Sequence, residues 1–193
     1  MSFTFCAVIL NFCCFSVYKI FCSPIFSSEF WANAFIVKIK IINKIDIRST
    51  DKVLEIGAGL GSLSYFLVNT NADIELIDID ERMLQYLQDN FSNKKNVTIR
   101  RQNILKADLQ KYSKIVGNLP YYITSATIEY VLLNAVNAKK IVFMTQKEVY
   151  PNLAYSSDSP LSMFLNYVCS ISSPIPVGRV NFCPIPHVDS VVF

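Results

Sequence analysis

The chain has 193 residues, of which 52% are hydrophobic and 17% charged, and its formal net charge is +3. This length suits one domain with a proper buried core, and the charge permits nucleic-acid binding without arguing for it. Six cysteines without a Cys-x-x-Cys pair and a single histidine, His187, argue against a disulfide framework, a metal site and a histidine-based hydrolase.

The first 27 residues form an apolar, cysteine-rich segment. Met1–Ile25 carries Lys19 as its one charge and holds four of the six cysteines. It lacks the basic start of a signal peptide and the arginines of a mitochondrial transit peptide, and its uncharged run is short for a membrane span of about 20 residues. We therefore expect residues 1–27 to lie outside the fold, residues 28–193 to form one domain, and no stable membrane association.

The next informative element is an apolar strand that begins at Lys52 and enters a turn containing Gly57, Gly59 and Gly61. Glycines permit a positive φ there and let a ligand approach the backbone closely. Neither a P-loop nor a dinucleotide glycine pattern fits, because no Lys-Ser/Thr pair follows and the glycine spacing differs. Glu55, just before the turn, would repel a pyrophosphate but suits a cationic cofactor. We predict an S-adenosylmethionine site involving Glu55, Gly57 and Gly59, followed by a helix over Ser62–Asn69.

Two further strands end in polar residues. The strand Ala72–Asp80 places acids about 20 residues after the glycine turn, the offset at which cofactor domains bind ribose hydroxyls. Its register favours Asp78 for that contact, whereas Asp80 suits a cap for the helix Glu81–Asn90; capping by both acids is the alternative. The strand Asn96–Arg101 leads to Asn103, whose side chain is placed to meet the donor's adenine ring.

A fourth strand, Ser113–Gly117, delivers Asn118 at its carboxyl end, where ligands sit in open α/β sheets. The Asn118 side-chain oxygen and a carbonyl of Leu119 or Pro120 would accept both hydrogens of an exocyclic adenine amine, drawing its nitrogen towards a nucleophilic geometry. Tyr121 would stack on the base. The alternative is a strand end followed by an ordinary turn.

These motifs, in this order, resemble the ribosomal RNA adenine dimethyltransferases. The blocks that carry the resemblance are Val53–Gly59, Ile77–Asp80, Val116–Tyr121, Met144–Val149, Pro160–Ser162 and Phe182–Ser190. The resemblance implies transfer of two methyl groups to N6 of each target adenosine in small-subunit rRNA. It also implies that Phe182 flanks the target base opposite Tyr121.

Some positions differ from the family's pattern. Glu29-Phe30-Trp31 stands where the family has an Asn-Phe-Leu element that closes over the donor. Asn103 replaces an acid at the donor's adenine, and Asp78 replaces a glutamate at its ribose. With Glu29 and Trp31 also at this site, we expect donor binding to be weakened before it is abolished. The family's C-terminal helical domain, which docks on RNA, is expected to be missing after Phe193.

The expected fold is α/β, a doubly wound and mostly parallel seven-stranded-type sheet of the Rossmann-like methyltransferase kind. Besides the elements above, we predict helices over Ala34–Ile45 and Leu161–Cys169 and a strand over Lys140–Gln146. A final pair of strands, Ser172–Val180 and Val188–Phe193, is predicted as an antiparallel addition at the sheet edge.

The expected function is S-adenosylmethionine-dependent dimethylation of small-subunit rRNA adenosines. The partner is ribosomal RNA in an immature small subunit, bound by a monomer without metal in the cytoplasm or alternatively in mitochondria. Two alternatives stay open: a large-subunit rRNA methyltransferase of the antibiotic-resistance type, and a catalytically impaired remnant that binds RNA or assembling ribosomes. The basic clusters Lys94-Lys95 with Arg100-Arg101, and Lys139-Lys140, are more typical of solvated faces than of RNA contacts.

Overall fold

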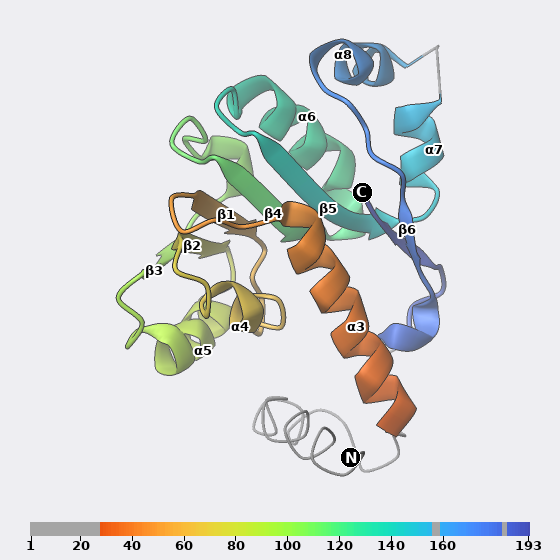
Figure 1. Cartoon of the computed structure of the whole chain (residues 1–193). Coiled ribbons are helices and arrows are strands. Elements are labelled where there is room, and N and C mark those ends of the chain that lie inside the picture. The colour runs from red at the N-terminus through yellow and green to blue at the C-terminus, as the bar shows by residue number, and fades with distance from the viewer. Residues whose placement is uncertain (1–27, 156–158, 183–184) are drawn as a thin grey trace.

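The structure, a computed structural model, describes residues 28–155, 159–182 and 185–193 (Figure 1). Its centre is one seven-stranded sheet with the order β3-β2-β1-β4-β5-β7-β6. Strands β1 to β5 are mutually parallel, and β7 is antiparallel to both β5 and β6. The strands are β1 (Lys52–Ile56), β2 (Asp73–Asp78), β3 (Val97–Arg101), β4 (Lys114–Asn118), β5 (Lys140–Gln146), β6 (Ile175–Val177) and β7 (Ser190–Val192).

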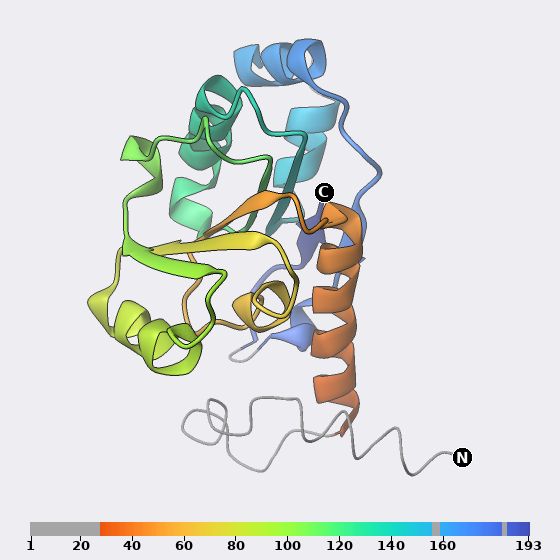
Figure 2. The same cartoon turned by 60° about the vertical axis from the view of Figure 1, so that its left-hand side comes forward.

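Helices cover both faces of this sheet, as Figures 1 and 2 show. The α-helices are α3 (Ser28–Ile45), α4 (Ser64–Leu67), α5 (Glu81–Phe91), α6 (Thr124–Asn134), α7 (Val149–Ala154) and α8 (Pro160–Val168). Three short 3-10 helices follow strands or lie in loops: η1 (Ile104–Lys106), η2 (Tyr121–Ile123) and η3 (Arg179–Asn181). The predicted doubly wound α/β fold is therefore confirmed.

The two faces bury separate hydrophobic clusters. The first core cluster joins α3, α4 and α5 to one face of the sheet, for example through Ile45, Leu67 and Leu87. The second core cluster joins α6, α7 and α8 to the other face, for example through Ile128 and Leu165. Because the central strands β1, β2 and β4 are covered on both sides, nearly every one of their positions is buried, as in parallel sheets generally.

A buried ion pair fixes the amino end of the central strands. The Lys114 ammonium lies 2.9 Å from the Asp51 carboxylate, and both side chains are less than a tenth exposed. Lys114 also donates to the Asp46 carbonyl, and Ser113 Oγ donates to Asp51 at 2.8 Å. This pair joins the segment before β1 to the start of β4, so it supports the β1–β4 register on which the site at the opposite edge depends.

The structure corrects several of the predicted elements. Helix α3 begins at Ser28 instead of Ala34, because no proline or glycine interrupts the preceding residues. Helix α4 spans Ser64–Leu67 alone, and α7 was missed. The last two strands are antiparallel as predicted but have three residues each; prolines, which cannot donate to a ladder, limit the first of them. The expectation for residues 1–27 lies outside the described residues.

Candidate functional site

The site lies where β1, β2 and β4 end side by side. Gly117 pairs with Ile56, and Ile56 pairs with Ile77, so Asn118 and the glycine turn share one edge of the sheet. Gly57 has a φ of +65°, and a Cβ built there would lie 3.9 Å from the Asn118 carbonyl oxygen. The turn therefore lies directly beside the end of β4, with Gly57 in a left-handed conformation that favours glycine.

Asp78 closes the glycine turn. One of its carboxylate oxygens accepts a hydrogen bond from Gly59 N at 2.8 Å. The other accepts from Ile79 N at 2.7 Å and Asp80 N at 3.0 Å. A carboxylate has about four acceptor positions, so the three bonds leave room for one more donor. The predicted contact of Asp78 with a ribose hydroxyl stays a prediction, while its hold on the turn is observed.

Asp80 caps α5, as predicted for that residue. Its carboxylate accepts from Arg82 N at 2.9 Å and pairs with the Arg82 guanidinium at 2.7 Å. Hydrogen bonds from Arg82 lower the pKa of the partly exposed Asp80 to about 2. The two acids at the end of β2 therefore have different tasks: Asp78 bonds the turn and Asp80 begins the helix.

Glu55 is buried beneath the turn, with 3% of its surface exposed. Its Oε2 accepts a hydrogen bond of 2.6 Å from Ser64 Oγ at the start of α4. Burial raises the pKa of Glu55 to about 8, and the nearby negative charge of Asp78 adds to the effect although Ser64 opposes it. Glu55 therefore supports α4 and the turn from below in the protonated form near neutral pH.

Ser62, which we expected to start the following helix, is exposed and makes no cap. Ser64 replaces it as the functional serine of this segment, and the sequence offered no signal that separated the two. A contact between Glu55 and a cationic donor stays a prediction.

Asn103 follows the end of β3, as expected, and lies exposed at the same edge. Its side-chain oxygen accepts from Leu105 N at 3.0 Å and so caps η1. The amide nitrogen and one acceptor position of the oxygen are left for a ligand. The predicted contact of Asn103 with the donor's adenine ring stays a prediction.

Asn118 is exposed at the carboxyl end of β4, and its side chain forms no hydrogen bond within the described residues. The two carbonyls that follow differ. The Pro120 carbonyl accepts from Ile123 N at 3.2 Å and from Thr124 Oγ1 at 3.0 Å. The Leu119 carbonyl accepts no hydrogen bond in the part of the chain that the structure describes. Of the two carbonyls considered, the structure therefore favours Leu119 as the second amine acceptor.

For the other predicted site residues, the structure gives no contact with the glycine turn or with Asn118 among the described side chains. Phe182 is half-buried and packs against the first core cluster, in the loop after η3, and its predicted role beside the target base stays a prediction. The side chains of Glu29, Trp31 and Tyr121 lie outside what the structure describes.

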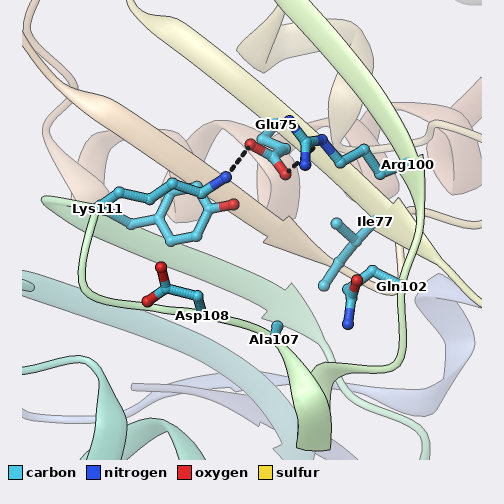
Figure 3. Close-up of a pocket in the computed structure, with 8 residues that line it drawn as sticks. Glu75, Ile77, Arg100, Gln102, Ala107, Asp108 and Lys111 are labelled. Carbon is cyan, nitrogen blue, oxygen red and sulfur yellow. Dashed lines mark hydrogen bonds and ion pairs between the residues drawn. The ribbon is translucent and has the colours of Figure 1, made fainter.

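A separate cavity of about 160 Å³ lies over β2 and β3, on the face of the second core cluster (Figure 3). Lys111 and Arg100 converge there on the buried Glu75, at 2.9 Å and 3.2 Å. Burial and a hydrogen bond with Glu75 raise the pKa of Tyr112. The cavity is lined by Glu75, Ile77, Arg100, Gln102, Ala107, Asp108, Lys111 and Tyr112. Neither the glycine turn nor Asn118 borders it, so it is not part of the site.

Within residues 28–155, 159–182 and 185–193, no group of three or more His, Cys, Asp or Glu side chains could hold a metal ion. In the same part of the chain, no helix has the length and apolar character needed to cross a membrane.

Comparison with known proteins identifies relatives. The sequence model of the family "Ribosomal RNA adenine dimethylase" matches residues 23–193. The chain is 32% identical over 167 residues to "Ribosomal RNA small subunit methyltransferase A" of Streptococcus thermophilus, covering 79% of this chain and 58% of the relative. It is 34% identical over 166 residues to the protein of the same name from Lactiplantibacillus plantarum, covering 79% and 56%. The chain thus spans less than two thirds of these relatives' length.

Solved structures are also similar to this chain, as two of them show. A dimethyladenosine transferase from Plasmodium falciparum superposes with a TM-score of 0.70 at 30% identity, over 81% of this chain and 59% of that one. The 23S rRNA methyltransferase ErmE superposes with a TM-score of 0.69 at 25% identity, over 81% and 65%.

Proposed function

Because the chain belongs to the ribosomal RNA adenine dimethylase family, we propose that it is an S-adenosylmethionine-dependent methyltransferase acting on N6 of adenosines in small-subunit ribosomal RNA. The observation that carries the proposal is the pair of free acceptors, the Asn118 side chain and the Leu119 carbonyl, beside the glycine turn. Binding by both draws electron density onto N6 of a flipped adenine, whose lone pair is otherwise delocalised into the ring.

The residues around the turn fit the methyl donor. Gly57 and Gly59 have positive φ. Because glycine has no side chain, a ligand can approach the backbone of the turn closely at both positions. Asp78 keeps one acceptor position for a hydroxyl, and Asn103 has an amide to donate. When bound, the donor supplies an electrophilic methyl group on a sulfonium. The chain's own part is to position N6 through Asn118 and Leu119, and the amine proton leaves to solvent after transfer.

The substrate and setting follow from the relatives' names. The relatives from Streptococcus and Lactiplantibacillus are named for the small ribosomal subunit, so we propose immature small subunits as the partner. We also propose a monomer acting in the cytoplasm, with mitochondria as the alternative. Size-exclusion chromatography with light scattering tests the monomer, and a dimer mass would contradict it.

The test combines calorimetric donor binding with methyl transfer to immature small subunits. We expect donor binding and transfer by the wild-type chain, and a loss of transfer of at least about 100-fold in Asn118→Ala, because misplacing a reacting group has costs of that order. Donor affinity should stay within about two-fold in this variant. Asn93→Ala is the matched control, since Asn93 is exposed in the loop before β3, at the opposite edge of the sheet.

Each contrary result has a distinct meaning. No donor binding at millimolar concentration would reject the enzyme and leave an RNA-binding remnant. Transfer to naked large-subunit rRNA but not to small subunits would instead establish the resistance-type activity. Full transfer by Asn118→Ala would refute the role of Asn118.

A further inference from the structure

Tyr122 is a large aromatic residue that the fold does not use. It lies in η2, directly after the Asn118–Tyr121 segment, and 81% of its surface is exposed. Its ring has no aromatic partner and its hydroxyl no hydrogen bond among the described residues. The start of α6 is instead secured through Pro120, whose carbonyl accepts from Ile123 N and Thr124 Oγ1. The tyrosine ring is therefore free to receive a partner beside the amine acceptors.

The 3-10 geometry of η2 limits which partner the Tyr122 ring can contact. Successive positions along a 3-10 helix are rotated by about 120° about its axis, so a base bound at the predicted position beside residue 121 would leave the exposed Tyr122 ring uncovered. A flipped adenosine leaves its neighbours in the strand with one stacking face uncovered. An exposed aromatic ring next to the flipping pocket is suited to cover that face, and stacking of this kind tolerates any base.

A cation lies at the same edge of the sheet. Lys147 follows the end of β5, which pairs with β4 so that Met144 is opposite Asn118. Its side chain is exposed and forms no ion pair in the described part of the chain, and the neighbouring Glu148 is exposed as well. A lysine here is one strand away from Asn118 and can meet a backbone phosphate.

The basic clusters noted in the sequence do not serve this purpose. Arg100 pairs with Glu75 and Arg101 with Glu81. Lys94-Lys95 precede β3, and Lys139-Lys140 lie at the start of β5, so both pairs lie at the amino end of the parallel strands, opposite to the site.

We propose that Tyr122 stacks on the nucleotide next to the target adenosine in single-stranded RNA, with Lys147 contacting a phosphate of the same strand. The inference rests on the proposed function and extends it, because it assigns a residue to the flanking nucleotide. It predicts that the substrate strand continues from the Asn118 pocket over η2 towards the end of β5.

The test uses single-stranded RNA of about eight nucleotides with a central adenosine and the fluorescent base 2-aminopurine on its 3′ or its 5′ side. With the wild-type chain and saturating S-adenosylhomocysteine, we expect quenching of 2-aminopurine on one side, as stacking produces. Tyr122→Ala should abolish the quenching and weaken RNA binding by roughly 5- to 100-fold, the range for loss of one aromatic stack. Tyr122→Phe keeps the ring and should retain both.

Two controls separate stacking from general effects. Tyr167 is 90% exposed and belongs to α8, which lies at the top of the molecule in Figure 1, away from α4, so Tyr167→Ala should behave as wild type. Lys147→Ala should lower the slope of log affinity against log salt by about 0.7, as loss of one single-strand phosphate contact does.

The outcomes test this inference separately from the proposed function on which it rests. Wild-type RNA binding and methyl transfer with no change in Tyr122→Ala would overturn the inference and leave the proposed function intact. Absence of RNA binding by the wild-type chain would overturn both. Equal losses in Tyr122→Ala and Tyr122→Phe would also overturn it, because a stacking role predicts rescue by the phenylalanine ring.

Discussion

Replacing Glu55 by glutamine should remove a pH dependence of stability that the buried carboxyl imposes. Burial raises the pKa of Glu55 from 4.5 to about 8 in the folded chain. Between these values the folded state binds more protons than the unfolded state. The stability contributed by Glu55 is therefore fully present below pH 4.5 and is lost as the pH rises through about 8. Glutamine has the same shape, no titrating group and an oxygen that accepts from Ser64.

The size of the effect follows from the shift. The free energy of unfolding should fall by about 1.4 kcal/mol per pH unit inside the window. Between roughly pH 5.5 and 8.5, the wild-type chain should lose about 3 kcal/mol that Glu55→Gln keeps. This is a large part of the roughly 5–15 kcal/mol by which domains are stable.

Urea unfolding of both chains across this range is the assay. Other titrating groups are common to the two proteins and cancel in the difference between their free energies of unfolding. A difference that stays constant with pH would refute the argument, because it would mean that Glu55 does not titrate between its two states. Ser64→Ala is the companion variant: it removes the hydroxyl that favours the ionised form, so its loss of stability should grow with pH.

Three further outcomes are expected. Asp78→Ala should release the glycine turn and weaken donor binding measured by calorimetry by about 10-fold or more, since hydrogen bonds to charged groups contribute about 1.5–3 kcal/mol each; unchanged affinity would show that the turn keeps its shape unaided. Gly61→Ala should destabilise the fold by more than about 1 kcal/mol in urea unfolding, because its φ is +73° and the new Cβ would lie 2.7 Å from the Phe91 ring; wild-type stability would count against that strain. Lys114→Met should cost about 3–5 kcal/mol by leaving the Asp51 carboxylate buried and unpaired. In the wild-type chain, burial would raise the pKa of Asp51, but hydrogen bonds from Lys114, Arg48 N and Ser113 hold that pKa below its usual value. The stability that Asp51 contributes is therefore lost as the pH falls through its folded pKa. A Lys114→Met chain with the acid sensitivity of the wild type would contradict this coupling.

The central sheet was predictable because its strands are marked by local patterns. Lys140–Gln146 is an apolar run between polar residues, and β5 has those bounds. The cap by Asp80 was predictable from its position before a helical pattern. Each of these features is decided within a few residues, so the sequence alone carries the information.

Features decided by tertiary contacts were not predictable. Helix α7 is one example, because it contains Pro151. Proline usually interrupts a helix, and it is tolerated here because it lies in the first turn. The choice of Ser64 over Ser62 depends on which hydroxyl reaches Glu55 across the chain. Likewise, Leu119 and Pro120 have equivalent carbonyls in sequence, and only the approach of Thr124 to Pro120 separates them.

The pairing of β1 with β4 has a consequence for the order in which the molecule acquires its properties. Lys52 N and Ser113 Oγ, 61 residues apart in sequence, are brought to 3.1 Å at one end of this pairing, and the glycine turn meets Asn118 at the other. Contacts so distant in sequence form after the loop-closure entropy between them has been overcome. A nascent or partly folded chain can thus build the turn without the amine acceptors. Acquisition of the complete pocket is then a readout of this long-range pairing, measurable by following methyl transfer during refolding.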